Sequence, residues 1–246
     1  MGRMAKKKLA VVYITHRNLN KEELLLFKFS IKNLVPYDKY LVIPEDFYSS
    51  NQFKGFVLIK EKKYFFTHIN GYNELLMLPS FYNHFKNYKN ILILQPDCVI
   101  LKKGIDRFCD IYPFIGASFI SPKYINKLWI SKIPRLGHLL SYLKYGLKIY
   151  GFNGGLSIRN VQFFKKNAPK LKTNSNRLLY REDIIYSYLT LQKIKSFDIN
   201  LADNFCLEEK LKFYDELKLI KSFAIHDPKK YNLNIYNEIL SLSKNF

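Results

Sequence analysis

The sequence has few acidic residues, and this shortage gives the chain a strong positive charge. Its 246 residues include 40 Lys and Arg against 20 Asp and Glu, so the formal net charge is +20. Such a balance favours polyanions or anionic membrane surfaces as partners. The chain is also rich in Lys, Asn, Ile, Tyr and Phe, which AT-rich codons favour, so a compositional origin for part of the charge stays open.

Cysteines and long apolar runs are scarce as well. The three cysteines, Cys98, Cys109 and Cys206, are odd in number and have no CxxC spacing. We therefore expect neither a disulfide framework nor a cysteine zinc site, and a cytoplasmic, reducing setting is the default. No segment approaches the roughly 18 apolar residues of a membrane span, and Leu9–Thr15 is short enough to be the first strand. We expect a soluble protein, or one bound peripherally to the inner membrane face.

Glycine-rich phosphate-binding motifs are missing. Neither GxxxxGKS, GxxxxGKT nor GxGxxG occurs, which argues against a P-loop NTPase and a conventional dinucleotide-binding protein. There is no internal repeat and no linker rich in Gly, Pro or Ser. With 48% hydrophobic residues, the chain can fill the core of one α/β domain over residues 1–246.

One long segment contains no acid at all. Between Ile111 and Arg181 the sequence has thirteen Lys or Arg and no Asp or Glu. Within it, Ser121–Tyr150 mixes basic residues with Trp129 and other apolar side chains, a pattern typical of a mobile lid or a membrane-surface segment. A solvated insertion in a lysine-rich protein is the alternative.

What the sequence does have is an alternation of short apolar runs and capped amphipathic segments. Apolar runs bounded by turn residues predict strands, and amphipathic segments with caps or proline stops predict helices. The predicted strands are Leu9–Thr15, Tyr40–Ile43, Phe56–Ile59, Ile91–Leu94, Pro113–Ala117, a strand beginning at Gly155, and Phe223–Ile225. The predicted helices are Lys21–Leu34, Tyr72–Phe85 broken or bent at Pro79, Lys103–Cys109, Val161–Asn167, Ile184–Leu191 and Ile235–Leu242. This alternation predicts βαβ units and a parallel sheet.

The central feature is the apolar run Ile91–Leu94 followed by Gln95, Pro96 and Asp97. Such a run suits a strand buried on both faces of a sheet. Pro96 cannot donate a backbone hydrogen bond, so regular pairing should stop or bulge there. Asp97 would then lie at the carboxyl end of the strand, where open α/β sheets bind ligands. An Asp that caps a turn is the alternative.

Three polar motifs follow later in the chain. Asn153-Gly154-Gly155 is a turn signal, and its glycines allow positive φ or a close backbone approach to a ligand. Glu182-Asp183 precedes an apolar helix, where acids also serve simply as N-terminal caps. His226 follows an apolar strand, a position in which a lone histidine is more often structural than functional.

The order of these motifs along the chain resembles that in nucleotide-sugar glycosyltransferases of the GT-A fold. They are most similar to a family of glycosyltransferase-like proteins with the pattern YNxLML, QxDA, GNGGxSLR, an acid pair before a helix, and a late His. The matching segments, within about Leu9–Tyr231, are Tyr72–Leu78, Gln95–Cys98, Phe152–Arg159, Glu182–Asp183 and Ile225–Asp227. The resemblance implies a single GT-A-like domain, an α/β fold with a Rossmann-like, mostly parallel central sheet flanked by helices.

The resemblance also implies a metal site. Asp97 and His226 would hold Mn²⁺ or Mg²⁺ on the diphosphate of the donor. Gln95 stands where the usual first acid would be, and it would contact ribose or the metal. This departure leaves metal dependence open, since Lys and Arg can neutralise a diphosphate instead.

The remaining matched residues would contact donor and acceptor. Asp183 would be the general base of an inverting transfer, with Glu182 beside it in a structural role, because adjacent residues at a helix start point about 100° apart. Asn153, Gly154 and Gly155 would line the donor-sugar or acceptor side.

Two further residues fall at the end of the first strand. Thr15 and Arg17 lie where such folds bind the nucleotide base and ribose. Arg159, at the end of the GNGGxSLR-like segment, is a further candidate, and a side chain that faces solvent is the alternative.

The expected function is transfer of a sugar from a UDP- or GDP-sugar to a glycan or glycolipid acceptor, as in lipopolysaccharide or capsule biosynthesis. A non-enzymatic nucleic-acid-binding protein is a rival suggested by the charge and by 20 Phe and 19 Tyr. The basic residues form no recognisable binding motif, so nucleic acid is not the expected partner. A metal-dependent nucleotidyl or phosphoryl transferase is a second rival, and it would need another acid close to Asp97.

Overall fold

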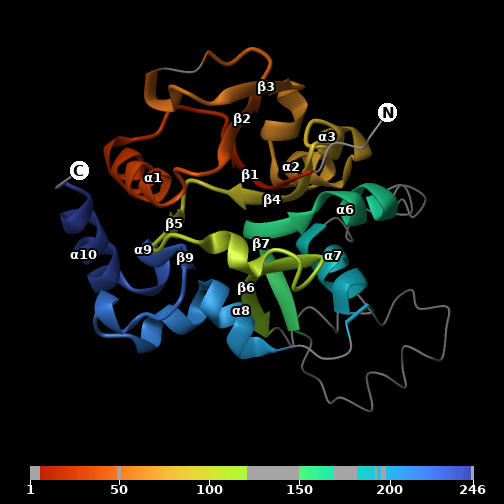
Figure 1. Ribbon diagram of the computed structural model, residues 1–246. Coiled ribbons are helices and arrows are strands. Elements are labelled where there is room, and N and C mark those ends of the chain that lie inside the picture. The colour runs from red at the N-terminus through yellow and green to blue at the C-terminus, as the bar shows by residue number, and fades with distance from the viewer. Residues whose placement is uncertain are drawn as a thin grey trace.

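A mixed sheet runs through the middle of the molecule, with helices packed around it (Figure 1). The structure is a computed structural model that describes residues 6–48, 51–120, 150–168, 182–191, 193–194 and 198–244. The segment expected to form a lid, Ser121–Tyr150, lies outside the described residues except for the backbone of Tyr150.

Within the described residues the strand order of this sheet is β3-β2-β1-β4-β7-β6. Strands β3, β2, β1 and β4 pair in parallel, while β7 is antiparallel to both β4 and β6. Only β7 therefore runs in the reverse direction, and the mostly parallel sheet expected from the sequence is confirmed. The strands are β1 (Lys7–Ile14), β2 (Asp38–Pro44), β3 (Val57–Glu61), β4 (Tyr88–Leu94), β6 (Phe114–Ile120) and β7 (Tyr150–Asn160).

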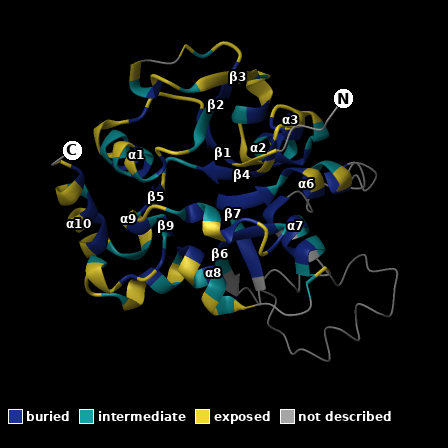
Figure 2. Ribbon diagram, viewed as in Figure 1, coloured by how far each residue is buried: buried dark blue, intermediate teal, exposed yellow. Residues whose placement is uncertain are grey.

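The continuous apolar runs form the centre of the sheet, as their pattern predicts. Val11 and Val12 of β1 and Ile91–Ile93 of β4 are completely buried, and Figure 2 shows these strands as the buried middle of the fold. Because helices cover both faces of these strands, a run without polar alternation is stable there.

A second, small sheet lies beyond the carboxyl end of β4, in the order β5-β9-β8. Its strands are β5 (Cys98–Ile100), β9 (Ala224–His226) and β8 (Cys206–Leu207). Val99, Leu207 and Ile225, one residue from each strand, share an apolar cluster with Leu26 of helix α1 (Lys21–Asn33) and Ile235 of helix α10 (Leu233–Ser243). The sequence predicted the run that forms β9, but neither β5 nor β8.

The helices begin and end largely where capping residues and prolines indicate. Asn20 accepts a hydrogen bond from the Glu23 backbone (3.0 Å) and Glu23 accepts one from the Asn20 backbone (2.9 Å), so the predicted capping box is present. The helices are α1 (Lys21–Asn33), α2 (Ile69–Met77), α3 (Pro79–Asn83), α6 (Val161–Asn167), α7 (Glu182–Leu191), α8 (Ile199–Phe205), α9 (Pro228–Tyr231) and α10 (Leu233–Ser243).

Two helix predictions need adjustment. Pro79 separates α2 from α3 and forms the first residue of α3, because it lacks the N–H that a continuous helix would need. The helix predicted at Lys103–Cys109 is a short 3-10 helix, Ile105–Phe108.

The turn predicted at Asn153-Gly154-Gly155 is wrong. These residues belong to β7 but lie at an irregularity in it, because β4 pairs only with Leu156–Asn160 and β6 pairs with the residues on either side of the motif. The Gly155 carbonyl instead accepts the N–H of Gln95. Among the described glycines, only Gly55 and Gly104 have positive φ. Conformational freedom is therefore not the reason for the glycines of this motif.

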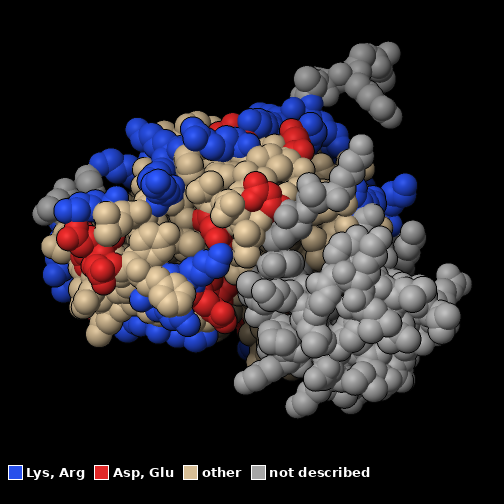
Figure 3. Space-filling model, turned by 90° about the horizontal axis from the view of Figure 1, so that it is seen from below, with Lys and Arg blue, Asp and Glu red and all other residues tan. Residues whose placement is uncertain are grey.

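The three cysteines lie in the interior, and charged side chains of both signs lie at the surface. Cys98, Cys109 and Cys206 are all buried and unbonded to one another. In the described part of the chain, no helix combines the length and apolarity needed to cross a membrane. Figure 3 shows Lys and Arg along the rim of one face with groups of Asp and Glu between them, so the described part of this face has no continuous basic stripe.

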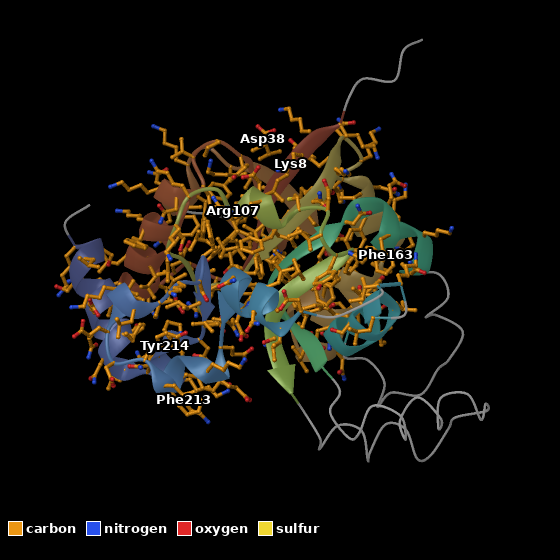
Figure 4. The ribbon with its side chains drawn as sticks, turned by 60° about the horizontal axis from the view of Figure 1, so that its bottom comes forward. Lys8, Asp38, Arg107, Phe163, Phe213 and Tyr214 are labelled. Carbon is orange, nitrogen blue, oxygen red and sulfur yellow. The ribbon has the colours of Figure 1, made fainter. Side chains whose placement is uncertain are left out.

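Most of the aromatic residues that the structure describes are buried, and a few lie at the periphery. Phe213 is 74% exposed and lies with Tyr214 at the outer edge of the molecule (Figure 4). Burial of the described aromatics supports their interpretation as core rather than as a nucleic-acid surface.

At the edge opposite Phe213 and Tyr214, Lys7 pairs with Asp38 (2.6 Å) and Lys8 pairs with Asp106 (2.9 Å), where the strands β1 and β2 begin.

Candidate functional site

The site begins where β4 ends. Pairing stops at Leu94, and the next four residues form a tight turn in which the Cys98 N–H donates to the Gln95 carbonyl (3.1 Å). Pro96 occupies the second position of this turn, which its fixed φ favours. The side chain of Asp97 is half exposed. The expected place of Asp97, at the carboxyl end of the central strand, is confirmed.

The small sheet brings His226 to Asp97. Cys98 lies directly opposite His226 in the antiparallel pair of β5 and β9, and the Asp227 N–H donates to the Asp97 carbonyl (2.8 Å). As a result, His226 Nε2 is 3.7 Å from Asp97 Oδ2. Asp227 has a φ of 49°, in the left-handed region that non-glycine residues rarely adopt, so the chain is strained just after the histidine.

Strand β7 closes the site from a third side through Gly155. The Gly155 carbonyl accepts the N–H of Gln95 (3.1 Å), which places the two backbones in contact. A Cβ on Gly155 would lie 2.4 Å from Gln95 Oε1, 2.8 Å from His226 Nε2 and 3.2 Å from Asn153 Oδ1. Three polar atoms therefore lie around the space that a side chain would fill. Glycine fits at this position because any Cβ would collide with them.

Gly155→Ala is expected to lower the free energy of unfolding by about 1–3 kcal/mol, the usual cost of overpacking. The amide of Gln95 can swing away, but the buried ring of His226 is held and has to shift. Urea denaturation measures the effect. The double variant Gly155→Ala with Gln95→Ala should recover only part of the loss, and full recovery would show that His226 does not limit the space.

Glu208 is the site residue that the sequence did not indicate. Its Oε1 lies 3.4 Å from His226 Nδ1, and it accepts hydrogen bonds from Asn153 Nδ2 (3.3 Å) and from the Tyr231 hydroxyl (3.5 Å). Burial lowers the pKa of His226, but Glu208 and Asp97 outweigh it, so this pKa is raised above its ordinary value. Glu208 follows the two-residue strand β8, and no local pattern marks it.

Asn153 connects these parts of the site. Its Oδ1 accepts the N–H of Gly155 (2.7 Å) while its Nδ2 donates to Glu208. Both ends of the amide are thus engaged, so Asn153 fixes the position of β7 against Glu208.

The acid pair approaches β7 at Gly154. A Cβ on Gly154 would lie 2.4 Å from Glu182 Oε1 and 3.4 Å from Asp183 Cβ. Asp183 is 8% exposed, in the first turn of α7. The structure therefore brings Asp97, His226 and Gln95 together beside Gly155, and places the Glu182 carboxylate and the Cβ of Asp183 beside Gly154.

Arg159 does not face solvent, which was the alternative left open by the sequence. It is completely buried and donates to Glu182 at 2.9 and 3.3 Å, to Gly154 O at 3.1 Å and to the Tyr82 hydroxyl at 3.3 Å. Its backbone lies between Ile91 of β4 and Phe114 of β6, in the interior of the sheet. Glu182 balances this buried charge, which gives Glu182 a structural role.

The start of α7 is attached directly to β7. Ser187 Oγ donates to the Asp183 carbonyl (2.6 Å) and accepts the N–H of Phe152 (2.8 Å). This bridge holds the first turn of the helix, and with it Asp183, beside the glycines of the strand.

Thr15 and Arg17 lie in the loop after β1, at the same edge of the sheet. Thr15 Oγ1 donates to the Arg17 carbonyl (2.8 Å), and the Arg17 guanidinium makes two hydrogen bonds to Glu23 (2.6 and 2.7 Å). These contacts fasten the loop to the capping box of α1.

The donor atoms present fit a divalent cation. In the part of the chain that the structure describes, Asp97, Cys98 and His226 each offer a ligand atom, and these atoms lie within 4.8 Å of one another. Carboxylate oxygen and imidazole nitrogen suit Mn²⁺, whereas Mg²⁺ prefers oxygen ligands alone. Burial raises the pKa of the Cys98 thiol, which disfavours the thiolate. No second carboxylate belongs to this described group, as the rival phosphoryl-transfer chemistry would require.

Comparison with solved structures defines the class of fold. The galactosyltransferase LgtC, in complex with donor and acceptor sugar analogs, aligns with a TM-score of 0.51 and 9% identity over 95% of each chain. An active-site mutant of LgtC gives 0.52 and 8% over 95% of each chain. A glycosyltransferase involved in glycosylation of the major capsid of PBCV-1 gives 0.51 and 10%, over 97% of this chain and 100% of that chain. The chain thus has the GT-A-like α/β fold of glycosyltransferases.

The sequence family is narrower than the fold. Residues 55–226 match the family model described as "Protein of unknown function (DUF5672)", and the chain belongs to this family. The matched range spans the site from Tyr72 to His226. No curated protein matches the sequence significantly.

Proposed function

We propose that the chain is a glycosyltransferase that uses a nucleotide-sugar donor, a UDP- or GDP-sugar, and a glycan or glycolipid acceptor. The observation that carries this proposal is the convergence of Asp97, His226 and Gly155 at the carboxyl end of β4. Ligands bind at this edge in open α/β sheets. The shared fold with LgtC, which was solved with donor and acceptor sugar analogs, supports the same assignment.

Asp97 and His226 would hold the cation, with Gln95 beside them. When bound, Mn²⁺ supplies positive charge that offsets the charge of the leaving diphosphate. The bare backbone at Gly155 lets a ligand come close to these polar atoms. Thr15 and Arg17 would contribute to the nucleotide end of the site, from the loop after β1.

Asp183 is the proposed general base, which takes the proton of the acceptor hydroxyl in an inverting transfer. Both oxygens of Glu182 bond Arg159, so Glu182 is committed to the buried pair. Asp183 is the other acid beside Gly154. A general base has to lie within hydrogen-bond reach of the proton that it takes.

The proposal includes the place in the cell where the protein meets its acceptor. An acceptor such as a lipopolysaccharide or capsule precursor would be met on the cytoplasmic side, with the protein peripheral on the anionic inner membrane face. The basic segment Ser121–Tyr150, which lies outside the described residues, would provide the contact.

The direct test is a donor panel. Purified protein is titrated with UDP- and GDP-sugars with and without Mn²⁺, and release of the free sugar is followed over time. The proposal expects binding of at least one donor and slow hydrolysis of it. Neither binding nor hydrolysis across the panel would reject the proposed function.

Asp97→Asn is expected to weaken Mn²⁺-dependent nucleotide binding by at least about 100-fold, more than the loss typical of an outer-shell residue. The substitution keeps the shape of a half-exposed side chain, so the fold should persist. Calorimetric titration measures the change, with the exposed Asp215→Asn as control. Unchanged affinity would remove Asp97 from the cation site.

A further inference from the structure

A buried histidine and a largely buried glutamate next to the proposed cation site contact each other. The side chains of His226 and Glu208 are 9% and 11% exposed, and His226 Nδ1 is 3.4 Å from Glu208 Oε1. The other ring nitrogen, Nε2, is 3.7 Å from Asp97 Oδ2. The imidazole is therefore held between two carboxylates, one largely buried and one half exposed.

Glu208 is itself held in place by two other elements. Asn153 of β7 and Tyr231 of α9 both donate to Oε1, the oxygen that also faces His226. A buried carboxylate is costly unless it is paired or hydrogen-bonded. Three groups surround Oε1, while Oε2 is buried without a hydrogen-bond partner, and the two hydrogen bonds to Oε1 fix the carboxylate on the Nδ1 side of the ring.

The two ring nitrogens of a neutral histidine have different roles. One carries the proton and the other the lone pair, and the hydrogen bond at one nitrogen decides which is which. Glu208 is the nearer and the more buried of the two carboxylates, and although its 3.4 Å contact with Nδ1 is not a hydrogen bond in the structure, its charge favours the proton on that nitrogen. The lone pair then lies on Nε2, facing Asp97 and the space beside Gly155.

We propose that Glu208 is a positioning residue that holds the His226 ring with its proton on Nδ1 and its Nε2 lone pair directed at the cation site. Ligating histidines commonly have such a carboxylate behind them, which fixes the ring and increases its basicity. Asn153 and Tyr231 support this role indirectly, because their hydrogen bonds hold the Glu208 carboxylate in place. This role rests on the proposed function for the cation, but the state of the ring can be tested without it.

The first experiment reads the tautomer directly in the metal-free protein. Long-range ¹H–¹⁵N correlation spectra, recorded at a pH where the ring is neutral, distinguish the two tautomers, and His226→Gln assigns the signal. Wild type should show the Nδ1-protonated form. Glu208→Ala should lose this preference, whereas Glu208→Gln should keep it, because Asn153 and Tyr231 hold the amide oxygen at the Oε1 position.

The second experiment measures Mn²⁺ binding without turnover, by the electron paramagnetic resonance signal of free Mn²⁺ in the presence of UDP. Glu208→Ala should lower the affinity by about 10–100-fold. Glu208→Gln should lower the Mn²⁺ affinity by a smaller factor than Glu208→Ala. Glu209→Ala, an exposed acid next in the chain, is the matched control and should behave as wild type.

The outcomes separate this inference from the proposed function. If Glu208→Ala keeps both the tautomer and the Mn²⁺ affinity, the positioning role is wrong while the glycosyltransferase proposal stands. Loss of affinity with an unchanged tautomer also overturns the positioning role. A wild type that binds neither Mn²⁺ nor a nucleotide sugar would overturn both.

Discussion

Arg159→Met is expected to destabilise the protein by about 3–5 kcal/mol, because it removes one partner of a buried ion pair. The pair joins β7 to α7, and both side chains are almost completely buried, at 0% and 2% exposure. Without the guanidinium, the Glu182 carboxylate has lost its counter-charge, and the Tyr82 hydroxyl and the Gly154 carbonyl have lost a donor. Urea or thermal denaturation measures the change.

Two controls isolate the cause. The double variant Arg159→Met with Glu182→Gln removes both charges and should recover most of the loss, since neutral replacement of a buried pair is often tolerated. Lys7→Met breaks an exposed pair with Asp38 and should cost at most about 1 kcal/mol. A small effect of Arg159→Met would mean that Glu182 is protonated or solvated in the folded protein.

Asp183→Asn is expected to lower turnover by about 10²–10⁴-fold, the usual contribution of a general base. Asparagine keeps the shape of the side chain but cannot take the proton of an acceptor hydroxyl. Nucleotide affinity should stay within a few-fold of wild type, because Asp183 is not one of the proposed cation ligands. Steady-state kinetics and donor titration together separate the two quantities.

Stability has to be followed in the same variant. Asp183 lies in the first turn of α7, where the helix dipole favours a negative charge, so a loss of about 0.3–1 kcal/mol is expected from that source alone. Asp215→Asn, at an exposed position, serves as the activity control. Full turnover by Asp183→Asn would exclude the residue as the base, and a proportional fall in nucleotide affinity would indicate a binding role instead.

Local chemistry was enough to predict several elements. Asn20 and Glu23 specify the start of α1, since both halves of the capping box lie within one turn of the chain. Pro96 ends β4 because it lacks an N–H, and this delivers Asp97 to the edge of the sheet. These features depend on neighbours in sequence, so a sequence pattern can predict them.

The structure of the Asn153-Gly154-Gly155 motif could not be predicted from a local sequence pattern. Asn-Gly-Gly is typical of a turn, but in the structure it is an irregular stretch within β7, between two segments that pair with β6. The actual constraint at Gly155 is the nearby Gln95 and His226, and at Gly154 it is Glu182. Contacts of this kind join residues that are far apart in the chain, and no local pattern contains them.

By itself, the sequence determined the buried central strand, its end at Pro96, the caps of the helices and the order of the polar motifs. Only the tertiary structure decided that Arg159 is buried against Glu182, that Glu208 lies behind His226, and that Glu182 packs against Gly154 while His226 packs against Gly155. The physical reason is that caps and breaks are local backbone effects, whereas the environment of a charge depends on which distant elements pack around it.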